Sequence, residues 1–288
     1  AGTNARGPAG YGEERRGIRM VLMQFQIHSK ILQMETDVWA LIPGTKPAPR
    51  RPNGQNQERT GPEENQEETW KVLWLLHGGV GDHTFWLRHT PIESIAESYG
   101  NLAVILPDAY GSSCVDTVSG ARFGTYLSQE LPGILRRILP KLSDKREDNW
   151  VSGFSNGGYG SLYLGFTFPE SYGAVGAFGA GDKADADFTN IEAEKERLFG
   201  KGDLHSSPYC VSQLAKDLGK SDRPKPILCH GCGSEDPWRD MNEIVRDAIL
   251  SVPGDPYHYE FRIWEGLGHS SACCEAAIRY FIQKMMEQ

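Results

Sequence analysis

The residues best suited to do chemistry form a G-x-S-x-G core, Gly153, Ser155 and Gly157, between a short apolar run and a predicted helix. A serine at a sharp strand-to-helix turn exposes its hydroxyl to substrate, and flanking glycines let the backbone crowd around it. We therefore predict that Ser155 is a nucleophile. Because a helix would begin just behind it, the amide of Asn156 and the positive end of the helix dipole would point at a developing acyl oxyanion. The alternative is an ordinary glycine-rich turn.

A serine nucleophile needs a base, and the base needs a carboxylate that holds its tautomer. His269 follows the last apolar run and precedes the last predicted helix, with glycines on both sides of Leu267 that let the loop bend back. We predict that His269 is this base. The alternative for any single histidine is a surface or core residue without chemistry. His77 is better explained as part of an oxyanion loop.

The acid is expected in the segment that follows the preceding apolar run. Asp236 is the preferred residue and Glu235 its rival, because one residue of register decides which side chain turns inward. Asp182 lies one strand earlier and is a more distant third candidate.

The oxyanion hole should combine the Asn156 amide with one from the loop after an earlier strand, here Gly79 in His77-Gly78-Gly79. The alternative is again a simple glycine turn. Trp86 and Trp238 lie near strand ends and are candidate substrate-pocket residues, although aromatic side chains also commonly pack in cores.

The elements that would position these residues are short runs that are apolar at every position, which is typical of central parallel strands. They occur at residues 71–76, 102–106, 150–154, 174–178, 226–229 and 259–264. Helical segments lie between them, at 91–98, 126–138, 161–168, 241–250 and 272–286. This alternation predicts an α/β fold with a mostly parallel sheet, helices on both faces and right-handed crossovers. The candidate residues all fall at carboxyl ends of strands, where ligands bind in such sheets.

Partial alternation at residues 20–27 and 37–42 predicts two antiparallel strands before the parallel ones. We expect one domain over residues 20–288, preceded by a flexible leader at 1–19. The polar stretch 44–69 is predicted to be a solvated insertion, and the alternative is a loop that folds over the site or a partner.

Composition excludes several classes of partner. The net charge of -8 argues against nucleic acid, and no apolar run approaches the roughly 18 residues needed to span a bilayer. A polar N-terminus without an apolar segment predicts a cytoplasmic protein, although the chain begins with Ala and a removed leader stays open. The 6 cysteines suit free thiols in a reducing compartment. Cys229 and Cys232 lack the second ligand pair of a metal site, so we predict no metal and no cofactor. A second copy of the chain, in a homo-oligomer, is a possible partner.

Taken together, these motifs resemble the putative-esterase family of α/β-hydrolases, which includes tributyrin esterases, S-formylglutathione hydrolases and several feruloyl and acetylxylan esterases. The likeness covers most of residues 20–286 and is carried by segments 29–36, 76–88, 102–107, 125–132, 143–148, 153–160 and 233–236. The resemblance implies a Ser155, Asp236 and His269 triad with the Gly79 and Asn156 amides as oxyanion donors, which favours Asp236 over Glu235. Asn156 stands where such enzymes often have Met. Ser270 and Ser271 stand where an acidic-aromatic pair is common.

We therefore predict a serine carboxylesterase that hydrolyses short acyl esters, of small molecules or carbohydrates, through an acyl-enzyme. Alternatives with the same chemistry are a feruloyl or acetylxylan-type esterase and an S-formylglutathione hydrolase. Resemblance to mycolyltransferases in the wider superfamily keeps acyl transfer open. A non-catalytic binding module is a different class of answer, and it has no need of nucleophile, acid and base in the required order.

Overall fold

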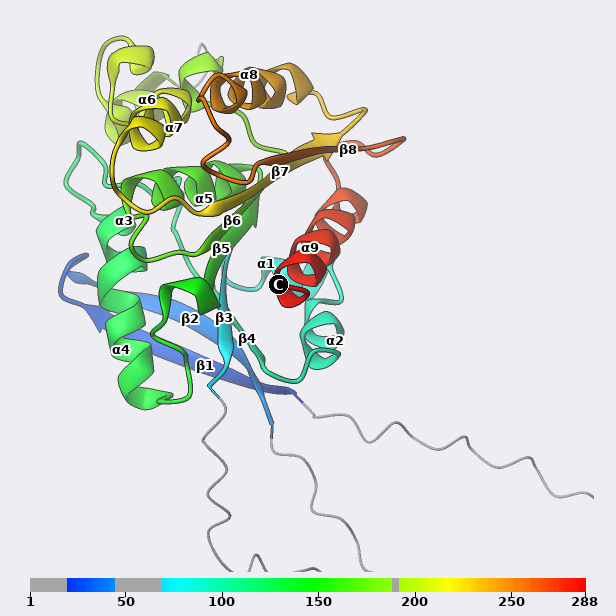
Figure 1. The fold of residues 1–288 in the computed structure, drawn as a ribbon. Helices are drawn as coiled ribbons and strands as arrows, with labels where there is room; N and C mark the ends of the chain where they lie inside the picture. The colour runs from blue at the N-terminus through cyan, green and yellow to red at the C-terminus, as the bar shows by residue number, and fades with distance from the viewer. Residues whose placement is uncertain (1–19, 45–68, 188–191) are drawn as a thin grey trace, which may run out of the picture.

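The computed structural model describes residues 20–44, 69–187 and 192–288 (Figure 1). These residues form an 8-stranded sheet in the order β1-β2-β4-β3-β5-β6-β7-β8. The strands are β1 (Met20–Ser29), β2 (Met34–Pro43), β3 (Lys71–Leu76), β4 (Leu102–Pro107), β5 (Asn149–Phe154), β6 (Ala174–Phe178), β7 (Ile227–Gly233) and β8 (Glu260–Trp264). The predicted leader, 1–19, and residues 45–68 of the predicted insertion lie outside the described residues.

The direction of the strands follows the prediction. β1 pairs antiparallel with β2, β2 pairs antiparallel with β4, and every other neighbouring pair is parallel. The mostly parallel α/β sheet is thereby confirmed. The carboxyl ends of β3 to β8 lie along one edge of the sheet, so the loops that leave these ends meet there.

Helices cover both faces of the sheet (Figure 1). The helix bounds are α1 (Phe85–His89), α2 (Ile92–Glu97), α3 (Phe123–Thr125), α4 (Leu131–Ile138), α5 (Asn156–Thr167), α6 (Glu192–Phe199), α7 (Val211–Lys220), α8 (Arg239–Leu250) and α9 (Ser271–Met286). Short helical turns are η1 (Tyr126–Glu130), η2 (Arg146–Asp148), η3 (Lys183–Asp185) and η4 (Leu204–Ser206). One face carries α1, α2 and α9, and the other carries α3 to α8 (Figure 1). No helix in the described ranges is long and apolar enough to cross a membrane.

Strand β3 shows why its sequence is apolar throughout. Val72, Trp74 and Leu76 pack into the core on one face of the sheet. Leu73 and Leu75 pack into the core on the other face. Because successive side chains of a strand point to opposite faces, a strand with helices on both sides must be apolar at every position.

Two helices differ from the pattern in the sequence. The helix predicted at 126–138 begins earlier, with α3, and contains a wider π-helical turn at η1. Pro132 has no N–H to donate to the carbonyl of Ser128, which instead accepts a hydrogen bond from Ser171 Oγ at 3.3 Å. The helix predicted at 161–168 begins at Asn156, because glycines that weaken helix propensity are required there for close packing.

Candidate active site

Ser155 occupies the sharp turn between β5 and α5. Its φ is 58° and its ψ is -124°, a left-handed conformation that is uncommon for a residue with a Cβ atom. The Ser155 amide donates to the Phe178 carbonyl at 2.9 Å, and its carbonyl accepts from the Tyr159 amide at 3.0 Å. The neighbouring strand and the first turn of the helix therefore hold a strained residue in place, and such strain clusters at functional sites.

Two glycines beside Ser155 are required by space. A Cβ atom on Gly157 would lie 2.4 Å from the carbonyl oxygen of Leu76. A Cβ atom on Gly153 would lie 2.4 Å from the backbone of Gly157. Helix α5 can thus start directly at the end of β5 only because both positions lack a side chain.

Asp236 and His269 lie together at the carboxyl ends of β7 and β8. His269 Nδ1 is 2.9 Å from Asp236 Oδ2, and Asp236 Oδ1 accepts from the Trp238 amide at 2.9 Å. The His269 ring packs against Phe154, the residue before Ser155, with ring centroids 4.6 Å apart. The described residues contain no hydrogen bond between Ser155 and His269, a contact that in such sites often tightens only with substrate.

The two rival acids point elsewhere. Glu235 is exposed and its amide donates to the Leu267 carbonyl at 2.9 Å, so its side chain turns outward where Asp236 turns inward. Asp182 is fully buried and accepts hydrogen bonds from the amides of Ala184 at 3.0 Å and Ser212 at 2.8 Å. Asp182 therefore anchors the turn after β6 and does not face His269.

The loop after β3 carries the predicted oxyanion donor Gly79. His77 is buried and fixes this loop: its Nδ1 is 2.7 Å from the Gly78 carbonyl, and its Nε2 accepts from the Ala109 amide at 2.9 Å. His77 therefore ties the Gly78 carbonyl to the backbone at the end of β4. A Cβ atom on Gly79 would lie 2.7 Å from Asn156 Nδ2, so the two predicted oxyanion residues are neighbours.

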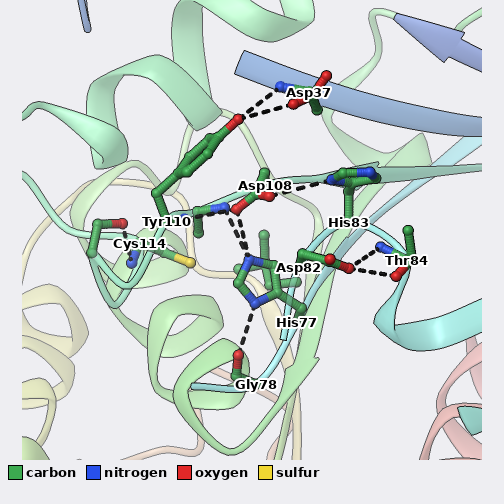
Figure 2. Close-up of polar contacts among 12 residues, drawn as sticks. Asp37, His77, Gly78, Asp82, His83, Thr84, Asp108, Tyr110 and Cys114 are labelled. Atoms are coloured by element: carbon green, nitrogen blue, oxygen red, sulfur yellow. Dashed lines mark hydrogen bonds and ion pairs between the residues drawn. The ribbon is translucent and has the colours of Figure 1, made fainter. Parts of the chain in front are cut away.

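Sequence reasoning missed the network that holds the β3 and β4 loops together (Figure 2). Asp108 is buried at the end of β4, accepts from the Tyr110 amide at 2.8 Å and lies 3.2 Å from His83 Nδ1. Burial alone would raise the pKa of Asp108, but its contacts with His77, the Tyr110 amide and His83 outweigh burial and keep the pKa below its usual value. The one indication in the sequence was the position of Asp108 directly after a buried strand.

The two pocket tryptophans lie in different places. Trp86 is 1% exposed and its indole N–H donates to the Leu76 carbonyl at 2.9 Å. It packs in the core, and we correct its assignment to the substrate pocket. Trp238 is 45% exposed and meets the His269 ring edge-on, with centroids 4.4 Å apart. Trp238 therefore lies on the open side of the predicted base.

The cysteines are free and buried. Burial raises the pKa of Cys229 to about 11 and that of Cys232 to about 12, so both stay as thiols at neutral pH. In the described part of the chain, no group of three or more His, Cys, Asp or Glu side chains is arranged to hold a metal ion.

His230, within the same Cys-x-x-Cys stretch, links the loop after β6 to helix α8 and to the residue before β8. Its Nε2 is 3.2 Å from both the Ala180 carbonyl and Asn242 Oδ1, and its Nδ1 is 2.9 Å from the Tyr259 hydroxyl. Asn242 also donates to the Trp238 carbonyl at 2.8 Å. His230 is completely buried, and burial lowers its pKa to about 4.

Acidification is expected to destabilise the fold through His230. In the unfolded chain its pKa returns to about 6.5, so below that pH the unfolded state binds more protons than the folded state. The His230 contribution is fully present above pH 6.5 and is lost toward pH 4, with a slope of at most about 1.4 kcal/mol per pH unit. Urea denaturation between pH 7.5 and 4.5 measures this slope.

His230→Gln should reduce the slope, whereas His28→Gln should not, because the His28 side chain is 63% exposed. Equal slopes in the wild-type protein and the His230→Gln variant would show that other groups cause the acid sensitivity.

The fold and this arrangement at the carboxyl edge define the class of α/β-hydrolases, and comparisons with known proteins agree. The family model described as "Putative esterase" matches residues 59–195. An acetyl esterase from Caldicellulosiruptor saccharolyticus is 27% identical over 81% of this chain and 89% of that protein. The chain resembles the esterases of this family and is a carboxylic ester hydrolase.

Solved structures give the same fold. An S-formylglutathione hydrolase from Staphylococcus aureus is 26% identical, with a TM-score of 0.72 over 93% of this chain and 99% of that one. A fluorophosphonate-binding serine hydrolase from the same organism is 24% identical, with a TM-score of 0.76 over 94% of this chain and 100% of that one.

Proposed function

We propose that the protein is a serine esterase in which Ser155, His269 and Asp236 act together. The observation that carries this proposal is the 2.9 Å contact between Asp236 Oδ2 and His269 Nδ1, at the same edge of the sheet as the half-buried Ser155. A carboxylate on Nδ1 keeps the proton on that nitrogen and leaves Nε2 free to accept the serine proton.

In the proposed cycle, Ser155 Oγ attacks the ester carbonyl while His269 takes its proton. The amides of Gly79 and Asn156 donate to the oxyanion of the tetrahedral intermediate. His269 then returns the proton to the departing alcohol, which leaves an acyl-Ser155 intermediate. Water attacks this ester with His269 again as the base, and the carboxylic acid is released. No step requires a cofactor.

Short acyl groups are the proposed substrates. The pocket beside the predicted oxyanion donors, whose lining includes Gly79, Cys114 and Asn156, is very small, which favours a short acyl group over a long one. The relative named acetyl esterase aligns over 89% of its own length, which supports the same choice. The exposed Trp238 ring borders the alcohol side of the proposed site.

A fluorophosphonate probe and a substrate panel test the proposal together. We expect the probe to label Ser155, as read by mass spectrometry of the modified peptide, and to abolish hydrolysis of p-nitrophenyl acetate and butyrate. Methyl ferulate, acetylated xylan and S-formylglutathione should be cleaved more slowly than the short esters. Labelling at another residue, or no turnover by the folded protein, would contradict the proposal. Faster cleavage of methyl ferulate, acetylated xylan or S-formylglutathione than of the short esters would reassign the substrate class.

A further inference from the structure

Lys183 is a half-buried cation beside the proposed nucleophile. It begins the turn η3 after β6, at the same edge of the sheet as Ser155. Its Nζ donates to Asn156 Oδ1 at 2.5 Å and lies 5.7 Å from the centroid of the Tyr159 ring. Burial lowers the pKa of Lys183, and the negative charge of Glu194 opposes this effect. Partial burial of an ammonium group already costs free energy unless the group is paired, so the position of Lys183 next to Asn156 needs an explanation.

The backbone that carries Lys183 is firmly held. The Asp182 carboxylate caps the turn by accepting from the Ala184 amide, and it also accepts from the Ser212 amide at the start of α7. Tyr159, which lies under the Lys183 ammonium, is 1% exposed and donates to the Tyr209 carbonyl at 2.8 Å. The ammonium therefore projects from a fixed turn over a fixed ring, which limits the positions that its Nζ can reach.

The contact with Lys183 decides how the Asn156 side chain is oriented. An ammonium group can only donate hydrogen bonds, so Asn156 must turn its oxygen toward Lys183 and its nitrogen away from it. That nitrogen lies against the oxyanion loop, 2.7 Å from the position that a Cβ atom on Gly79 would take. The Asn156 side chain thus spans the distance between Lys183 and Gly79.

We propose that Lys183 is a positioning residue for ester hydrolysis, which locks the Asn156 side chain against Gly79 and so holds the two oxyanion amides at their working separation. This inference rests on the proposed function of those amides. The charge-assisted hydrogen bond from Lys183 also polarises the side-chain amide of Asn156. This makes the side-chain NH₂ group, which lies beside the oxyanion loop, more positive.

The inference makes the effect of Lys183 depend on the residue at position 156. The family that the sequence resembles often has Met there, and a thioether is only a weak hydrogen-bond acceptor. In an Asn156→Met background, Lys183 has no strong acceptor to hold. A double-mutant cycle between the two positions therefore separates action through Asn156 from a general effect of charge.

The experiment measures kcat and KM for p-nitrophenyl acetate in wild type, Lys183→Met, Asn156→Met and the double variant. We expect Lys183→Met to lower kcat about tenfold with KM changed less than about twofold, because the lost interaction acts on the transition state. In the Asn156→Met background, Lys183→Met should change kcat by less than about twofold. Lys183→Arg, which keeps the charge and the donors, should restore most of the rate.

Lys141→Met is the matched control, because Lys141 also lies over an aromatic ring, 5.9 Å from the Trp70 centroid, but at the amino end of the sheet. It should leave kcat unchanged. Affinity for a boronic acid, which forms a tetrahedral adduct with an active-site serine, should fall in Lys183→Met in parallel with kcat/KM.

An equal loss of kcat from Lys183→Met in both backgrounds, or a wild-type rate in a folded Lys183→Met protein, would overturn the inference. A thermal melting curve shows whether Lys183→Met is folded. If it is unfolded, Lys183→Arg provides the test. A wild-type kcat and boronate affinity in Lys183→Arg support the inference, and a tenfold loss of kcat overturns it. If only the inference about Lys183 is wrong, the fluorophosphonate probe still labels Ser155. If the proposed function is wrong, the probe does not label Ser155.

Discussion

Replacing Ser155 with alanine is expected to lower kcat for p-nitrophenyl acetate by at least about 10⁴-fold. The variant loses the only atom that can form the acyl-enzyme in the proposed cycle, while the amides of Gly79 and Asn156 stay in place. Residual activity should come from these donors and from substrate binding alone. The measurement compares initial rates of purified wild type and variant, each with a thermal melting curve that reports intact folding.

Ser152→Ala is the matched control for this prediction. Ser152 lies on β5 three residues before Ser155, is fully buried, and its hydroxyl has no hydrogen-bond partner among the described residues. Its removal should leave kcat within about twofold of wild type, since no contact is broken. Comparable rates in wild type and Ser155→Ala would remove Ser155 from the mechanism.

Asp236→Asn is expected to lower kcat by about 10³- to 10⁴-fold. An asparagine can place an N–H group against His269 Nδ1, which stabilises the tautomer with its proton on Nε2. That tautomer cannot accept the serine proton, and the imidazolium that forms during catalysis loses the negative charge that stabilises it. The Asn side chain has nearly the same shape, so the hydrogen bond from the Trp238 amide can be kept and folding should be little affected.

Glu235→Gln provides the comparison, because it makes the same chemical change one residue away. Glu235 is exposed and lies outside the contact with His269, so kcat should stay within about twofold of wild type. The pH profile of kcat/KM adds a second readout, since Asp236→Asn should alter its acidic limb and Glu235→Gln should not. The reverse pattern would assign the acid to Glu235.

The parallel strands could be predicted from the sequence because both of their faces are buried. Strand β7 is the exception in length, since the predicted run at 226–229 extends to Gly233. Gly231 is a poor strand residue by propensity, but it pairs with both β6 and β8. The neighbouring strands override local preference there. The position of β4 between β2 and β3 depends on how the connections between strands cross the sheet, and the local sequence carries no pattern that shows it.

The candidate site residues and their order along the chain could be predicted from the sequence, but the contacts between them could not. Ser155 and His269 were indicated by motif and position, whereas the choice between Asp236 and Glu235 depends on a turn whose geometry involves Leu267, some thirty residues away. The contact between Asn156 and Lys183 likewise joins residues 27 positions apart. Such contacts depend on how loops from different strands meet, and no periodicity encodes them.

Trp86 illustrates the opposite error. Its position after a strand end suggested a pocket wall, but α1 turns its ring inward, where the indole N–H finds the Leu76 carbonyl. A tryptophan with its N–H satisfied can be buried without cost, and sequence position alone does not distinguish this case from an exposed ring such as that of Trp238.

The order of the proposed catalytic groups along the chain has a consequence for protein synthesis. Ser155 and both oxyanion residues precede β6, whereas Asp236 follows β7 and His269 follows β8. A ribosome therefore produces the nucleophile first and the base last, and domains of this kind tend to fold as units. A nascent chain that already exposes Ser155 has no base to activate it, so we expect it to be chemically inert toward cellular esters until the C-terminal helix α9 is released and packs onto the sheet.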